Sequence, residues 1–194
     1  MLGIPVGLMV FGCGEWAVHR YLLHGRVGGW LGRGHDAHHE AASRHGGYDP
    51  AYEGPAWGSV TQLREVAGLF AVGALHAPLL VVAPFYTATI WYCLARYRRD
   101  HRRAHLDPAW ARDHLPWHYD HHLGDPSRNF GVAWSWADVV AGTREVFVGS
   151  EQERAGSREH AARAAAASAG AALRAQRRRP ARRLRVRAPR PRPG

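Results

Sequence analysis

Residues 66–95 form an uninterrupted apolar segment, which constrains the fold of this chain more than any other feature of its sequence. The segment reads VAGLFAVGALHAPLLVVAPFYTATIWYCLA and carries no formal charge over its 30 residues. A helix that spans a bilayer needs about 20 apolar residues, whereas apolar stretches in the core helices of soluble proteins are shorter. We therefore expect this segment to lie in a membrane.

The same segment is long enough to cross the membrane twice. With its polar shoulders, from Ser59 to Asp100, it has 42 residues, which is about 63 Å of helix at ~1.5 Å per residue and fits two passes of about 30 Å. The natural break lies near His76, Pro78 and Pro84, because proline removes a helical donor. Both ends then emerge on one side, which the positive-inside tendency assigns to the cytoplasm. The basic residues at these ends are Arg64, Arg96, Arg98 and Arg99.

The segments around this hairpin predict further helices. Residues 2–18 are apolar and glycine-rich, and they suit a short or tilted crossing, a re-entrant piece, or the remnant of a longer helix. Residues 101–149 mix tryptophans with charges, a composition that suits a cap at the membrane interface. We therefore predict an all-α integral membrane bundle with a cytoplasmic, histidine-rich helical cap. This domain covers residues 1–149, with the apolar hairpin at about 59–100.

The charge of the chain is concentrated in its C-terminal tail. All 26 basic residues are arginine, and residues 1–150 hold 13 arginines and 13 acids, so the net charge of +10 comes from residues 151–194. This distribution argues against a basic globular nucleic-acid-binding fold. The Ala/Arg/Pro-rich tail, residues 150–194, is expected to be largely disordered. We expect it to bind anionic lipid rather than a specific nucleic acid.

Histidine clusters are the second defining feature. Ten of the 14 histidines fall in four clusters, His19-x4-His24, His35-x2-His38-His39, His101-x3-His105 and His118-x2-His121-His122. Spacings of three and four residues place imidazoles on one helix face. His19 and His24 lie roughly 140° apart on an ideal α-helix, so we expect that helix to end or unwind at Gly25. The hairpin returns the second and third clusters to the same side, where a single site can form.

Ten imidazoles without thiolates predict two metal ions with about five ligands each. Cys13 and Cys93 lie far apart, which excludes a thiolate zinc site and a disulfide framework. Structural zinc is satisfied by four ligands, whereas imidazole-rich sites with spare positions suit iron. A haem pair is the competing interpretation, but haem ligands usually lie singly inside helices. A non-catalytic metal-binding membrane protein is a further alternative, although only His76 lies within the crossing.

The cluster order and the sequence that follows it resemble a known family. Residues 129–143 read NFGVAWSWADVVAGT, and over residues 15–145 the chain resembles the fatty acid hydroxylase and sterol desaturase superfamily of integral membrane di-iron enzymes. The resemblance implies an oxygen-dependent hydroxylase or desaturase that acts on a fatty acyl or sterol-like lipid. Carotenoid ring hydroxylation is the alternative within the same chemistry.

The resemblance also implies the cofactors, the partners and the ligands. The cofactors are two iron ions, with zinc as the alternative occupant after isolation, and O2 is the co-substrate. Electrons would come from a separate cytochrome, ferredoxin or reductase, since the chain lacks a flavin or nicotinamide fingerprint. The implied metal ligands are His19, His24, His35, His38, His39, His101, His105, His118, His121 and His122. His45 and His114 fall outside the pattern.

Two further sets of residues are candidates for supporting roles. Metal-bound imidazoles commonly donate their other N–H to a carboxylate or carbonyl. The candidates for this role are Glu15, Asp36, Asp100, Asp113, Asp120 and Asn129. The candidates for lining a lipid channel are Leu69, Phe70, Phe85, Tyr86 and Trp91.

Overall fold

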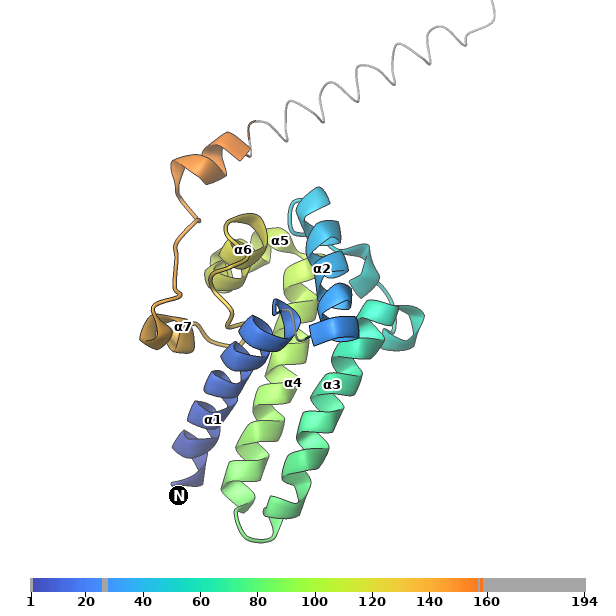
Figure 1. The fold of residues 1–194 in the computed structure, drawn as a ribbon, viewed down its shortest axis with the longest axis vertical. Coiled ribbons are helices and arrows are strands. Elements are labelled where there is room, and N and C mark those ends of the chain that lie inside the picture. Colours follow the sequence, from blue (N-terminus) through green and yellow to red (C-terminus); the bar gives the residue numbers. More distant parts are fainter. Residues whose placement is uncertain (1, 26–27, 157, 159–194) are drawn as a thin grey trace, which may run out of the picture. The chain divides into compact units, whose positions relative to one another are not determined.

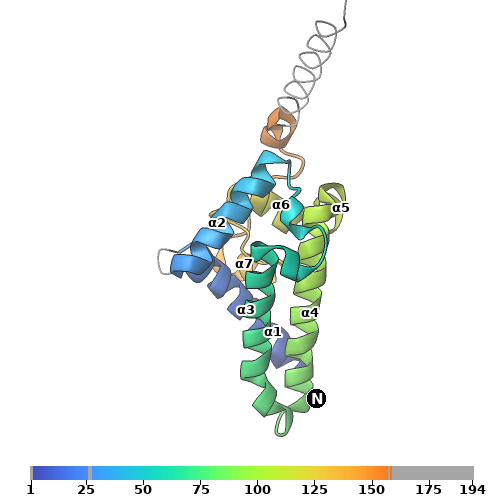
Figure 2. The ribbon, with the colours of Figure 1, turned by 90° about the vertical axis from the view of Figure 1, so that its right-hand side faces the viewer.

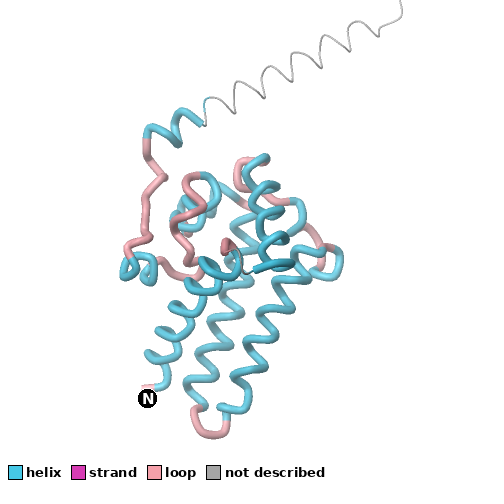
Figure 3. Tube along the Cα trace, in the orientation of Figure 1, coloured by secondary structure: helices cyan, strands magenta, loops and turns pink. Residues whose placement is uncertain are grey.

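The computed structural model describes residues 2–25, 28–156 and 158. Helices and loops make up this part of the chain, and no strand occurs in it (Figure 3). The predicted all-α class is therefore confirmed. Two compact units divide the chain, Met1–Glu153 and Arg154–Gly194. The tail predicted to be disordered lies, from residue 159 onward, outside the described residues, and the predicted boundary at residue 149 stays a prediction.

The apolar segment forms a helical hairpin. Helix α3 covers Val60–His76, a 3-10 turn covers Ala77–Leu80, and α4 covers Pro84–Leu106. The chain therefore reverses at the proline-containing break that the sequence predicts. Val60–Leu80 is the helical segment, among the described residues, whose length and composition suit a membrane span.

Helix α1, Gly3–Ala17, packs along the first half of α4 (Figure 1). Gly7 makes this close approach possible, because a Cβ atom at this position would press against Thr89 of α4. Next to this contact, Phe11, Ile90, Cys93, Leu94 and Ala133 form a buried apolar cluster. A small core thus joins the middle of α1 to the first half of α4 and to Ala133, in the loop that precedes α7.

Four further helices form a cap at one end of α1, α3 and α4 (Figures 1 and 2). They are α2 (Gly29–Arg44), α5 (Pro108–His114), α6 (Pro116–Leu123) and α7 (Trp136–Ala141). Proline at the first position starts α5 and α6, where its missing N–H costs nothing. Two 3-10 turns, Pro50–Tyr52 and Ala56–Gly58, connect α2 to α3.

The two ends of this unit differ in which side chains they expose and which they bury. The long helices expose large apolar side chains, among them Leu2, Met9, Phe70, Leu75, Val81, Val82 and Phe85. The cap buries histidines and acids instead, including His118, Asp120 and His121, each at most 1% exposed. Apolar exteriors of this extent mark interaction surfaces in proteins.

Candidate metal centre

A π-helix brings the first histidine pair together. Val18–Leu23 has π-helical hydrogen bonding, and the His24 amide donates to the His19 carbonyl oxygen at 3.0 Å. Residues five apart share a face in this geometry, so the two rings stack with centroids 5.1 Å apart. The expected end of the helix at Gly25 is therefore not what reunites them; a change of helix type does. Single π-helical turns inside α-helices are frequent at functional sites.

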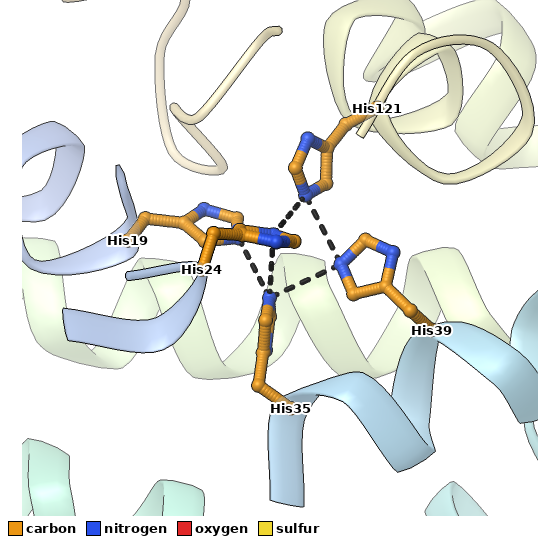
Figure 4. A group of neighbouring side chains, drawn as sticks. All are labelled: His19, His24, His35, His39 and His121. Carbon is orange, nitrogen blue, oxygen red and sulfur yellow. Dashed lines mark hydrogen bonds between the residues drawn. The ribbon is translucent and has the colours of Figure 1, made fainter. Parts of the chain in front are cut away.

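Five histidines form the first group, in which the Nε2 atoms converge (Figure 4). The His35 Nε2 atom lies 2.9 Å from that of His19, and 3.1 Å from those of His24 and His39. The His121 Nε2 atom lies 3.0 Å from that of His24 and 3.1 Å from that of His39. Three elements contribute these side chains: the π-helix, α2 and α6.

A second group lies beside the first. His38, His101, His105 and His122 are all buried, with one ligand atom from each within 4.8 Å of the others. The His118 Nε2 atom is 3.1 Å from that of His105. The rings of His39 and His122 stack with centroids 4.1 Å apart, which joins the two groups. All ten histidines named from the sequence therefore meet in one place, and their role as ligands stays a prediction.

Backbone carbonyls fix the protonation of three rings. The Nδ1–H of His19 donates to the Phe130 oxygen at 2.5 Å, and that of His121 donates to the Arg128 oxygen at 2.6 Å. In the second group, His105 donates to the Gly47 oxygen at 2.9 Å. Because a carbonyl oxygen only accepts, each Nδ1 atom carries the proton and each Nε2 atom keeps its lone pair.

Carboxylates take the same role for two rings of the second group. His38 Nδ1 lies 2.6 Å from Asp49 Oδ2, and His101 Nδ1 lies 3.0 Å from Glu65 Oε2. Glu65 also accepts from the Tyr52 hydroxyl at 2.5 Å and pairs with Arg98 at 3.2 Å. These contacts have the form that orients metal-bound imidazoles.

The arrangement of lone pairs fits bound metal. His101 and His105 both direct an unprotonated Nε2 atom at the other, 3.3 Å apart, because their Nδ1–H groups donate to Glu65 and Gly47. Two such atoms cannot hydrogen-bond to each other, so their lone pairs repel unless a cation lies between them. The buried Nε2 atom of His38 has no hydrogen-bond partner among the described residues. Burial lowers the pKa of His121 to about 3 and holds the pKa of His19 well below its usual value, so both rings are neutral at pH 7, the form of imidazole that can bind a metal.

The six side chains expected to accept hydrogen bonds from the imidazoles have other surroundings. Three of them bind backbone amides or Arg144: Glu15 accepts the Val132 and Ala133 amides, Asp120 pairs with Arg144, and Asn129 accepts from Arg144 and Glu145. The other three lie near arginines or solvent: Asp100 pairs with Arg96 and Arg99, Asp113 lies beside Arg112, and Asp36 is exposed. None of the six hydrogen-bonds to an imidazole within the described part of the chain, so that expectation is wrong. The acids that do so are Asp49 and Glu65. Glu65 carried a usable signal, because an acid beside a membrane segment is costly unless it is paired.

The NFGV segment supports the first group through its backbone. The Asp138 carboxylate accepts the amides of Phe130 at 2.8 Å and Gly131 at 2.7 Å, and the Thr143 hydroxyl at 2.7 Å. Asn129 adopts a φ of 58°, the left-handed conformation that asparagine tolerates better than most residues. Asp138 thereby holds the loop whose carbonyls orient His19 and His121.

An apolar cavity of about 420 Å³ lies between α1, α3 and α4 and reaches His19, His35, His38 and His101. Of the five residues expected to line a channel, Leu69 lines this cavity. Phe70, Phe85 and Trp91 are exposed, and Tyr86 packs against the buried apolar cluster. The channel prediction is therefore wrong for these four. A second, polar pocket of about 410 Å³ is lined by His24, His39 and His122 together with Asp36 and Glu40.

The other histidines of the described residues lie outside both groups. His45 and His114 are exposed and donate to carbonyl oxygens one turn earlier, those of Ala41 and Trp110. His76 likewise donates to Val72. The two excluded from the ligand pattern thus lie outside both groups.

Comparison with known proteins agrees with this geometry. A model of the fatty acid hydroxylase family matches residues 4–143, more than two thirds of the chain. The search of curated proteins and the search of solved structures gave no match. The matched region contains α1, the hairpin, both histidine groups and the Asp138 loop. The chain therefore belongs to the fatty acid hydroxylase family.

Proposed function

We propose that this protein is an oxygen-dependent hydroxylase or desaturase of a membrane lipid, and that its ten clustered histidines hold two iron ions. One observation carries the proposal: ten histidines converge in two adjacent groups at the end of an apolar cavity, and the Nε2 atoms of His19, His105 and His121 are unprotonated. A fatty acyl or sterol-like lipid fits such a cavity better than a polar metabolite does.

The two groups divide the metal ions between them. The first ion would be held by His19, His24, His35, His39 and His121, and the second by His38, His101, His105 and His122 with His118 beside them. Iron bound there would supply the activation of O2 that oxidation of an unactivated C–H bond requires.

The chain itself positions the ligands and the substrate. Phe130, Arg128 and Gly47 carbonyls, with the Asp49 and Glu65 carboxylates, hold the imidazoles in one tautomer and one orientation. Cavity residues such as Leu69, Ile90 and Leu94 exclude water from the space next to the histidines. Electrons would come from a separate cytochrome, ferredoxin or reductase.

We place the long helices in the membrane and the cap on its cytoplasmic side. The exposed apolar side chains of α1, α3 and α4 support the first part, because lipid would cover them. The arginines at the cap end of the hairpin, Arg64, Arg96, Arg98 and Arg99, support the second part.

The test combines metal analysis with lipid profiling. Anaerobically purified protein should contain about two irons per chain and show Mössbauer signals of histidine-bound iron. Cells that express the protein should contain an oxidised lipid that disappears with His121→Ala and persists with His114→Ala, a matched control because His114 is exposed and bonded to Trp110. Stoichiometric zinc with an unchanged lipid profile would instead identify a non-catalytic metal-binding protein. An oxidised carotenoid would identify the carotenoid ring hydroxylase alternative.

A further inference from the structure

One face of α3 lines the apolar cavity, and its side chains change from polar to apolar along the helix. Thr61, Arg64 and Glu65 line the cavity at the cap end of the helix, and Leu69 and Val72 line it farther along. His76 also lines it, at the end of α3. Arg64 and His76 are about 18 Å apart along the helix axis. The cavity therefore has a polar end beside the two histidine groups, an apolar middle along Leu69 and Val72, and His76 at its far end.

Arg64 lacks an anionic partner at this polar end. Among the described residues it forms no hydrogen bond or ion pair, and its buried Nε atom is unpartnered. Its guanidinium carbon lies 4.1 Å from the centre of the Trp30 ring, a contact that positions the group without neutralising its charge. A Cβ atom on Gly34 would overlap the guanidinium, so glycine at this position leaves the arginine its space.

Two carboxylates line the same cavity, and neither forms an ion pair with Arg64 among the described residues. Glu65 accepts from Tyr52 and pairs with Arg98 and His101. Glu15, on the α1 wall, accepts two backbone amides through one oxygen. Neither acid pairs with Arg64. A cation next to an apolar cavity without a counter-charge is unfavourable, so a ligand that brings a negative group to this end would remove that cost.

We propose that Arg64 binds the anionic head group of the lipid substrate, whose alkyl chain then lies along α3 toward Val72. This inference rests on the proposed function, because it takes the cavity as the place where the lipid binds. The guanidinium matches a carboxylate or phosphate through two parallel N–H donors, whereas an ester offers no charge. Arg64 is therefore a specificity-determining residue that selects acidic lipids over neutral ones.

The experiment compares three lipids that differ in their head group. Binding of palmitic acid, methyl palmitate and hexadecyl phosphate is measured on the full-length, iron-loaded protein in a neutral detergent. The acid or the phosphate should bind about tenfold more tightly than the ester, as a charge-assisted hydrogen bond predicts. The order of the acid and the phosphate shows whether a free carboxylate or a phosphate head group is preferred.

Two variants assign this preference to one side chain. Arg64→Gln should bind all three lipids with similar affinity, at the affinity of the ester. Arg33→Gln, which removes an exposed arginine of α2, should keep the preference. Iron content and the unfolding temperature of Arg64→Gln show that the variant is folded. A wild-type protein that binds the ester as tightly as the acid, or a preference that survives in Arg64→Gln, would overturn the inference and leave the proposed function intact. Failure of all three lipids to bind would overturn the inference and exclude a fatty acyl chain as the occupant of the cavity, whereas the lipid profiling above tests the proposed function itself.

Discussion

The second histidine group uses carboxylates as well as a backbone carbonyl, that of Gly47, as partners of its Nδ1 atoms. Backbone carbonyls accept from His19 and His121 in the first group, whereas carboxylates accept from His38 and His101 in the second. A carboxylate is the stronger acceptor and makes the imidazole a better electron donor to a metal. The second group should therefore depend on acidic side chains that the first group does not need.

Replacing Asp49 tests this dependence. Asp49→Asn removes the charge 2.6 Å from His38 while keeping the size of the side chain. We expect the affinity of the second group for metal to fall about 10-fold to 100-fold, as is typical for such partners. The first group should keep its affinity, because its Nδ1 partners are unchanged. Metal titration of the metal-free protein, followed by Mössbauer spectroscopy at one and two equivalents of iron, separates the two groups.

Asp113→Asn is the matched control, because Asp113 is exposed beside Arg112 and hydrogen-bonds to none of the ten clustered histidines. Equal loss of metal from both groups in Asp49→Asn would contradict the division, and so would unchanged binding.

At the residue scale the sequence predicts the ligand set but not its supports. Clustered spacing points to all ten histidines, since imidazoles three or four residues apart must share a helix face. The supports depend on contacts between distant segments, such as Glu65 with His101 and Phe130 with His19. Every residue has a backbone carbonyl, so residue types do not show which carbonyl oxygens accept hydrogen bonds from His19, His105 and His121.

Two local elements set the geometry of the first group, namely the π-helix and the loop before α7. The five-residue spacing of His19 and His24 contained the signal for the π-helix, because only a wider turn aligns them without breaking the helix. The hairpin was predictable for a similar reason, since Pro78 and Pro84 fix where an apolar helix must break. The loop conformation was not, because it depends on an acid eight residues away from Phe130.

Replacing Asp138 tests the loop as an element. Asp138→Ala removes the acceptor of two buried amides and the Thr143 hydroxyl. We expect a loss of about 2–3 kcal/mol in unfolding free energy, and a loss of iron from the first group as the Phe130 carbonyl moves away from His19. Thermal unfolding and metal analysis in detergent measure both effects.

Asp125→Ala, in the exposed turn that precedes this loop, is the control. It should change the unfolding free energy by less than about 1 kcal/mol. An equally stable Asp138→Ala protein with full iron content would show that the loop holds its shape without this carboxylate.

At the scale of the whole molecule, charge separates the chain into a neutral helical part and a basic tail. Residues 154–194 contain 13 arginines and one acid. We expect a chain that ends after Glu153 to keep its iron, and the tail segment alone to bind vesicles rich in phosphatidylglycerol, because each arginine near such a surface contributes about 1 kcal/mol. Vesicle co-sedimentation of the tail segment alone, at low and high salt, isolates this contribution. Salt-independent binding, or loss of iron on truncation, would contradict the prediction.

The last prediction concerns which side of the membrane each end of the hairpin faces. Val60–Leu80 has 21 residues, about 31 Å of helix at ~1.5 Å per residue, which equals the thickness of the hydrocarbon core. Val81, 89% exposed at the turn, should therefore reach the side opposite the cap. In a background with Cys13→Ser and Cys93→Ala, we introduce Glu40→Cys on α2 or Val81→Cys at the turn. An impermeant maleimide should label Glu40→Cys only from the cytoplasmic side and Val81→Cys only from the other side. Labelling of both from one side would mean that the hairpin re-enters without crossing, and a reversed pattern would place the cap outside the cytoplasm.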